Sequence, residues 1–169
     1  REWPFFRSML DNAGQSESKG VELEFRGVPT VHTEGFLSFG YTDAKFVDYV
    51  DGEDDFGGNR IPYIPEYTFH AGFTYRHQFD YDMLDAVMFQ ADYRGVGKHY
   101  WQEENISYQN YYGLLNSKIS FKKDRFELSL YGKNLLNEDY QAFYFRAMGR
   151  SYAQIGQPAI YGMKLKVSF

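Results

Sequence analysis

The chain has 169 residues, a net charge of −5 and an aromatic content of 20%, with 16 tyrosines and 16 phenylalanines. Mean hydropathy is low at −0.57, and no apolar run approaches the ~20 residues that a transmembrane helix requires. The lack of cysteine excludes a disulfide framework and a thiolate metal site, and the negative charge argues against a nucleic-acid partner.

Most of the chain alternates between apolar and polar residues with a period of two, which is the pattern of a β-strand with two different faces. In chain order these segments are 21–26, 37–42, 69–76, 87–94, 115–121 (interrupted at Ser117), 126–131 and 161–169. The last is the clearest: every odd residue from Tyr161 to Phe169 is apolar or aromatic, and every even residue is glycine, lysine or serine. The pattern predicts seven antiparallel strands.

The two faces of these strands need different surroundings. One face is rich in Phe, Tyr and Leu, whereas the other carries Glu, Arg, Lys, Asp and Gln, and no amphipathic helix pattern is available to cover the apolar face. Lipid covers such a face in a transmembrane β-barrel, and a second sheet covers it in a soluble sandwich. The aromatic content favours the barrel, and the sandwich is the alternative.

Connections between the predicted strands alternate in length. The short ones are 28–34, 80–85 and 122–125, and the long ones are 50–66, 101–111 and 137–158. Outer-membrane barrels have short periplasmic turns and long outer loops. If the last strand runs toward the periplasm, every short turn falls on that side. Aromatic residues cluster near both strand ends, including Tyr100, Trp101 and Tyr140 at one end and Phe36 and Phe121 at the other, as two interfacial belts would.

Short motifs occur in a fixed order along nearly the whole chain, and only residues 1–10 contribute none. They are NAG at 12–14 with SKGVELE at 18–24, YTDAKF at 41–46, IP at 61–62 with PEYT at 65–68, GKNLLNEDY at 132–140, and GQP at 156–158 with YG at 161–162. In this order the chain resembles the barrel of TonB-dependent outer-membrane receptors, and residues 1–169 resemble its C-terminal part.

The resemblance implies an all-β fold of about seven or eight strands within a 22-stranded antiparallel barrel with a plugged lumen. It implies energised import of a scarce ligand, most often a ferric siderophore, across the outer membrane of a Gram-negative bacterium. Implied partners are lipid and lipopolysaccharide, the rest of the barrel, the TonB complex through a plug that this sequence lacks, and the barrel-assembly machinery. A complete eight-stranded barrel with a structural or adhesion role is the alternative, and it needs residues 1–10 to supply a strand.

The resemblance also marks residues in the last predicted strand and in the connection that leads to it. Asn134, Leu135 and Tyr140 match the family motif, and the asparagines there are suited to binding backbone groups where a strand ends. Gly162, with its neighbour Tyr161, leaves room for a ring to lie across the strand. The resemblance implies that these residues and Phe169 form the end signal for barrel assembly.

Ligand contacts are expected in the long connections. His99 and Trp101 are predicted to line a vestibule, and the last long connection carries basic and aromatic residues that suit an anionic, catecholate-like iron chelate. Those residues are Tyr144, Arg146, Arg150 and Tyr152. Pairing with lipopolysaccharide or with acidic loop residues is the alternative.

Other chemistry is weakly indicated. The four histidines lack the spacing of a metal site, and the acidic segment 51–55 is read as a solvated loop rather than a Ca²⁺ site, since its spacing does not match an EF-hand. Catalytic triads, phosphate-binding loops and dinucleotide motifs are absent from the sequence. We expect no cofactor and no enzyme activity.

Overall fold

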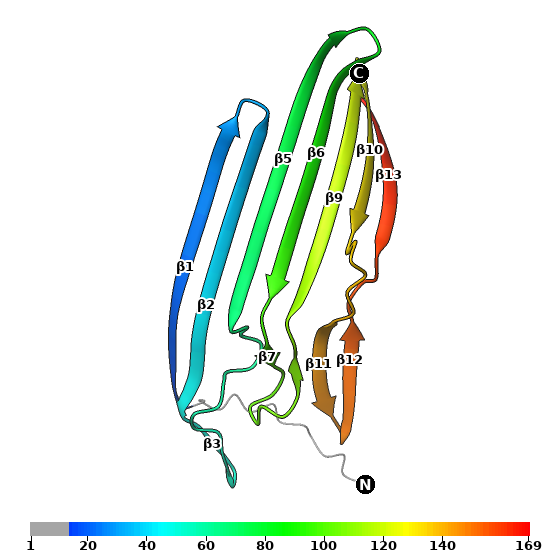
Figure 1. Cartoon of the computed structure of the whole chain (residues 1–169). Helices are drawn as coiled ribbons and strands as arrows, with labels where there is room; N and C mark the ends of the chain where they lie inside the picture. The colour runs from blue at the N-terminus through cyan, green and yellow to red at the C-terminus, as the bar shows by residue number, and fades with distance from the viewer. Residues whose placement is uncertain (1–13) are drawn as a thin grey trace.

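The computed structural model describes residues 14–169, which form a single curved layer of seven antiparallel strands (Figure 1). These are β1 (Gln15–Thr30), β2 (Thr33–Asp48), β5 (Tyr67–Tyr81), β6 (Leu84–Val96), β9 (Tyr112–Lys123), β10 (Phe126–Lys133) and β13 (Ile160–Val167). Each strand pairs with its neighbours in that order. The seven predicted strands are confirmed, and most are longer than their alternating segments.

Six short strands were not predicted, and they form three two-stranded ribbons within the long connections. The pairs are β3 (Val50–Asp51) with β4 (Asp54–Asp55), β7 (His99–Tyr100) with β8 (Tyr108–Gln109), and β11 (Gln141–Ala147) with β12 (Arg150–Ile155). All three lie at the end of the sheet opposite the short turns and the C-terminus (Figure 1). The predicted parity of short and long connections is therefore confirmed.

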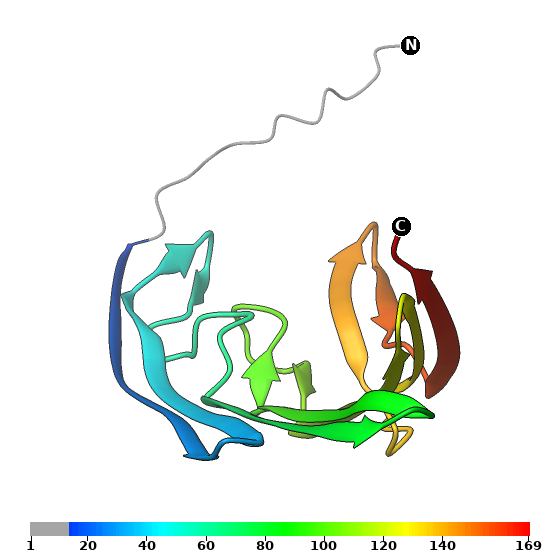
Figure 2. The same cartoon turned by 90° about the horizontal axis from the view of Figure 1, so that it is seen from above.

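The sheet is bent into an open arc (Figure 2). The cyan ribbon β3–β4 and the orange ribbon β11–β12 lie over its concave side. Strands β1 and β13 form the two edges and do not pair with each other. Within residues 14–169 the sheet thus does not close into the small barrel of the alternative interpretation, and the strand that it requires from residues 1–10 lies outside the described residues.

Register keeps the two faces distinct across the sheet. Leu128 pairs with both Phe121 and Leu165, whereas Ser129 pairs with Ser120 and Lys164. Directly paired residues point to the same face, so apolar and polar rows run across several strands. Leu128 is 36% exposed and Leu165 is 64% exposed, because nothing in the described chain covers the apolar face.

Buried apolar side chains gather at one end of the molecule. Within residues 14–169 they are Ala44, Phe46, Val96 and Trp101, and all four lie where strands meet the long connections. No core therefore lies under the middle of the sheet. No helix of the described residues is long and apolar enough to span a membrane.

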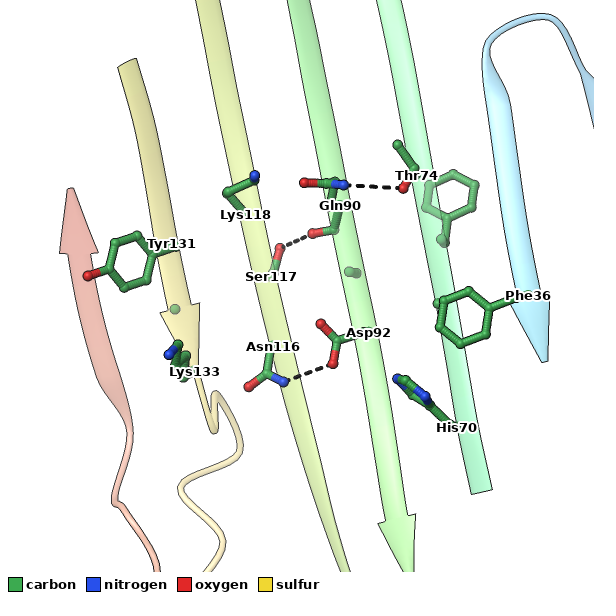
Figure 3. A pocket seen from close by; sticks show the side chains of 14 residues that line it. Phe36, His70, Thr74, Gln90, Asp92, Asn116, Ser117, Lys118, Tyr131 and Lys133 are labelled. Atoms are coloured by element: carbon green, nitrogen blue, oxygen red, sulfur yellow. Dashed lines mark hydrogen bonds between the residues drawn. The ribbon is translucent and has the colours of Figure 1, made fainter. Parts of the chain in front are cut away.

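One residue of the expected aromatic belts is placed differently. The ring of Phe36 lies over Gly72, where an added Cβ would come within 2.1 Å of it, and packs edge-on against His70 with centroids 4.7 Å apart. Both Phe36 and His70 line the concave side (Figure 3). The expectation that Phe36 belongs to an interfacial belt is wrong, because side chains alternate along β2 and the alternation that turns Leu37 outward turns Phe36 to the concave face.

Candidate functional site

The motif 132–140 closes the long connection between β10 and β13. Asn134 is 4% exposed and has a positive φ of 47°. Its side-chain oxygen accepts from the Glu138 amide at 2.9 Å, and its side-chain nitrogen donates to the carbonyls of Glu138 at 3.0 Å and Gln157 at 2.9 Å. One amide thus joins the two ends of the connection, which matches the predicted backbone-binding role of this asparagine.

Other residues of the motif extend this closure. The side-chain oxygen of Asn137 accepts from the Ala159 amide at 3.0 Å. Tyr140 stacks on Tyr112 with centroids 4.5 Å apart and covers Gly156. Leu135 folds back over Gly132. We conclude that the motif holds the connection against the wall, so its placement is structural.

A cluster of aromatic rings joins the three long connections. Trp101, 4% exposed, packs against His99 at 4.6 Å, Tyr63 at 5.5 Å and Tyr144 at 6.3 Å between ring centroids. The Tyr63 hydroxyl donates to the carbonyl oxygen of Tyr144 at 2.9 Å. The structure therefore brings together three of the predicted ligand residues, but His99 and Trp101 are largely covered by the loops.

The indole N–H of Trp101 is buried and has no acceptor within residues 14–169. A buried donor without a partner is costly and rare. It marks the centre of the cluster as a place where a group from outside the described chain would gain a hydrogen bond.

A second junction was not predicted. The Arg60 amide donates to the side-chain oxygen of Asn105 at 2.8 Å, and the Asn105 side-chain nitrogen donates back to the Arg60 carbonyl at 2.9 Å. The Arg60 guanidinium lies 3.2 Å from Asp43 and 3.5 Å from Glu66. Sequence offered no signal for this contact between residues 45 positions apart.

The β11–β12 ribbon carries the exposed candidates. Arg146 pairs with Ser151, whereas Arg150 pairs with Ala147. The two arginines therefore lie on opposite faces of the ribbon. Arg146 shares its face with Tyr144, and Arg150 shares its face with Tyr152, whose ring stacks on Phe145 at 5.1 Å.

The two phenols that join the aromatic cluster, Tyr63 and Tyr144, have pKa values shifted in opposite directions. Burial, followed by the charge of Glu103, raises the pKa of Tyr63. Hydrogen bonds with Ser107 and then Ser151 lower the pKa of Tyr144. The pKa of the Tyr144 phenol is therefore the lower of the two.

The concave face of the wall holds an open cavity of about 640 Å³. Polar groups line it from β5 to β10, and Figure 3 shows the Asn116 side-chain nitrogen donating to Asp92 at 2.8 Å. The side-chain oxygen of Asn116 accepts from the Asn134 amide at 3.1 Å. The cavity wall is therefore linked by hydrogen bonds to the closure of the last connection, which the sequence did not reveal.

The predicted end signal lies on the last strand and just beyond it. Tyr131 covers Gly162, where an added Cβ would come within 2.4 Å of the ring, so the expected ring packing is confirmed. Tyr161 is 70% exposed and Phe169 is fully exposed. The assembly role of these residues stays a prediction.

Metal ions in proteins are held by characteristic arrangements of side chains. No group of three His, Asp or Glu side chains within residues 14–169 is arranged to hold a metal ion. The acidic segment lies in the exposed β3–β4 ribbon, and the Gly57 amide that follows the ribbon donates to the Asp55 carboxylate at 2.8 Å.

The family follows from comparison of the sequence with known protein families. Residues 4–135 match the model described as "TonB dependent receptor-like, beta-barrel". The chain belongs to this family. Its members are transporters rather than enzymes and reside in the Gram-negative outer membrane.

Individual relatives agree with this assignment. The chain is 25% identical over 167 residues to the pesticin receptor of Yersinia pestis, and 24% identical to that of Yersinia enterocolitica. Each match covers 98% of this chain and 24% of the relative. The chain thus spans about a quarter of the length of these curated relatives.

Solved structures show the same fold. The ferric yersiniabactin uptake receptor FyuA of Yersinia pestis matches with a TM-score of 0.81 and 24% identity, covering 94% of this chain and 24% of that one. The siderophore receptor PiuA of Acinetobacter baumannii matches with a TM-score of 0.72 and 18% identity, covering 90% of this chain and 22% of that one. The seven strands therefore correspond to part of a TonB-dependent receptor barrel.

Proposed function

We propose that this chain is the C-terminal part of the barrel of an outer-membrane receptor that imports a ferric siderophore with energy from the TonB complex. The segment supplies wall, outer loops and the last strand. A plug domain, outer-membrane lipid, lipopolysaccharide and the barrel-assembly machinery are its proposed partners. The names of the similar proteins support this class of ligand, since FyuA is described as a ferric yersiniabactin uptake receptor and PiuA as a siderophore receptor.

The observation that carries the ligand class is the β11–β12 ribbon. It places exposed Arg146 and Arg150 beside aromatic side chains, at the end of the sheet that holds all the long connections. Guanidinium groups and aromatic faces suit an anionic chelate with aromatic donors. Because the two arginines lie on opposite faces, one ligand contacts one of them directly, and we favour Arg146 because it shares a face with Tyr144.

The test uses the full receptor with single substitutions. We expect Arg146→Ala to weaken binding of a ferric catecholate siderophore about tenfold, the effect of about 1.4 kcal/mol, and Arg150→Ala to weaken it less. Affinity is measured by quenching of protein fluorescence in detergent, with uptake of radioactive iron as a second readout. Arg125→Ala is the matched control, since Arg125 lies in the turn at the opposite end.

Unchanged affinity in both arginine variants would remove the ribbon from the ligand site. A different result is that both arginine variants lose affinity equally for lipopolysaccharide and keep their affinity for the siderophore. That result would favour the alternative, in which these arginines bind phosphate groups at the membrane surface.

A further inference from the structure

Two histidines that are far apart in the sequence meet at the turn end of the sheet. Strands β5 and β6 extend past the turn that joins β1 to β2 (Figure 1), and the β2–β5 ladder ends there with Thr33 opposite Tyr75. His32 lies in the turn just before Thr33, and His77 lies on β5 just beyond Tyr75. Their ring centroids are 5.4 Å apart, which the spacing of histidines along the sequence did not predict.

The backbone of β5 holds the His32 ring in one orientation. The Arg76 amide donates to the His32 carbonyl at 2.7 Å, and the His32 Nδ1 lies 3.1 Å from the Arg76 carbonyl oxygen. A carbonyl only accepts hydrogen bonds, so Nδ1 carries the proton and Nε2 keeps its lone pair. A backbone carbonyl on Nδ1 is a partner that commonly orients a metal-binding histidine.

His77 is held in a comparable way by side chains of its own strand. Its Nδ1 lies 3.4 Å from the Tyr75 hydroxyl, and its ring packs edge-on against Phe79 with centroids 4.5 Å apart. A phenol accepts as well as it donates, so this contact is retained when Nδ1 carries the proton and Nε2 has the lone pair. Within residues 14–169 neither His32 Nε2 nor His77 Nε2 forms a hydrogen bond.

The separation of the two rings suits one shared metal ion. With metal–nitrogen bonds of about 2 Å and a tetrahedral angle, two imidazoles on the same ion have their centroids about 5 Å apart. The rings of His32 and His77, at 5.4 Å, are close to that separation. The guanidinium of Arg76 is directed at the Met88 sulfur, at 3.6 Å, so its positive charge is not placed between the two rings.

We infer that His32 and His77 form a binding site for a divalent ion of the class of Cu²⁺, Zn²⁺ and Ni²⁺, with Cu²⁺ bound most tightly. Two imidazoles supply the protein ligands, and water completes the coordination. The bound ion ties the β1–β2 turn to β5 beyond the last pair of their ladder. Because the site lies at the end opposite the long connections, it is independent of the ligand that the proposed function assigns to the receptor.

Titration of Cu²⁺ into the full receptor, purified in detergent and stripped with a chelator, tests the site. We expect electron paramagnetic resonance to show two nitrogen ligands, and His32→Gln or His77→Gln to weaken binding of this ion more than about tenfold. His70→Gln is the matched control, because His70 lies on the same strand but packs against Phe36 on the concave face. The difference between wild type and variants isolates this site from any other histidines of the receptor.

Two further measurements separate the roles of the residues. Zn²⁺ is expected to slow hydrogen exchange of amides 28–34 several-fold in the wild type but not in His77→Gln, although His77 lies outside that segment. Tyr75→Phe removes the hydroxyl beside His77 Nδ1 and should weaken Cu²⁺ binding about tenfold while both nitrogens remain ligands. Heat-modifiable migration on gels checks that every variant has folded.

Three results would count against the site or the function separately. Cu²⁺ binding that is unchanged in both histidine variants would overturn the site. A loss in His77→Gln alone, with one nitrogen ligand, would mean that the turn does not take part, which also overturns it. Uptake of a radioactive ferric siderophore is assayed independently, so a receptor that binds Cu²⁺ as expected but imports no chelate would contradict the proposed function alone.

Discussion

The strand wall and the loop end of this molecule are stabilised in different ways. Along the wall, large apolar side chains such as Leu23 and Phe25 are more than half exposed, and ladder hydrogen bonds are the main internal contacts. At the loop end, Trp101 and Asn134 are each 4% exposed and are held by specific ring and hydrogen-bond partners. The apolar face of the wall has to be covered by lipid, whereas the side chains of the loop end cover one another in a small core.

This difference separates two kinds of sequence information. A wall residue has only to be apolar or polar according to its face, because lipid adapts to any apolar shape. A loop-end residue has to meet individual partners, as when Asn134 satisfies backbone groups of Glu138 and Gln157. We therefore expect substitutions at the loop end to act locally and substitutions on the wall to act through the bilayer.

The largest expected effect is at the centre of the aromatic cluster. Trp101→Ala in the full receptor should lower the local free energy of opening of residues 97–111 by about 3–5 kcal/mol, because a buried indole and its packing are lost. Hydrogen exchange measured by mass spectrometry gives this value. Amides of β1 and β2 serve as the internal reference, and Trp101→Phe should retain most of the protection. Faster exchange along β1 and β2 as well would show that the loop core supports the wall, which would break the comparison.

A charge on the lipid face tests the wall. Leu37→Arg should lower the free energy of unfolding in lipid vesicles by about 2–4 kcal/mol, the cost of a charge near the bilayer midplane. Ser38→Arg is the matched control, since Ser38 is the next residue of the same strand and pairs with His70, which lines the concave cavity. Urea titration of the folded receptor measures both. Equal losses in the two variants would mean that the faces are not solvated differently.

A smaller effect is expected at the closure of the last connection. Asn134→Ala should cost about 2 kcal/mol, because backbone groups of Glu138 and Gln157 lose their partner. Asn134→Gly keeps the positive φ without strain but removes the same hydrogen bonds, so it should recover only part of the loss. Hydrogen exchange of amides 134–159 measures the loss in both variants. Full recovery in the glycine variant would show that the backbone conformation, and not the amide, matters here.

The sequence predicted the structure best where apolar and polar residues alternate with a regular period. The seven strands, their two faces and the side of every long connection followed from alternation and loop length, because a strand between lipid and a polar lumen has two solvents at fixed spacing. Motif order gave the family. The six short strands were missed because two to seven residues within a polar loop leave no comparable pattern.

Contacts within the candidate site were less predictable. Composition identified Trp101, Tyr144, Arg146 and Arg150 as candidates. It did not predict that Trp101 lies beneath the loops or that the two arginines lie on opposite faces of their ribbon. Arg60 and Asn105 had no signal, since their contact joins two connections by backbone and amide groups that any loop carries. Phe36 lies on the concave face because it alternates with Leu37 along β2, and the general preference of aromatics for the interface does not override that alternation.

The sequence by itself determined that this chain consists of antiparallel strands with one apolar and one polar face, since a period of two places the two kinds of side chain on opposite sides of each strand. Only the tertiary structure decided what the loops do and which histidines meet at the turn end. Those properties depend on which residues of neighbouring strands and distant connections come to lie side by side, and register and loop packing set that.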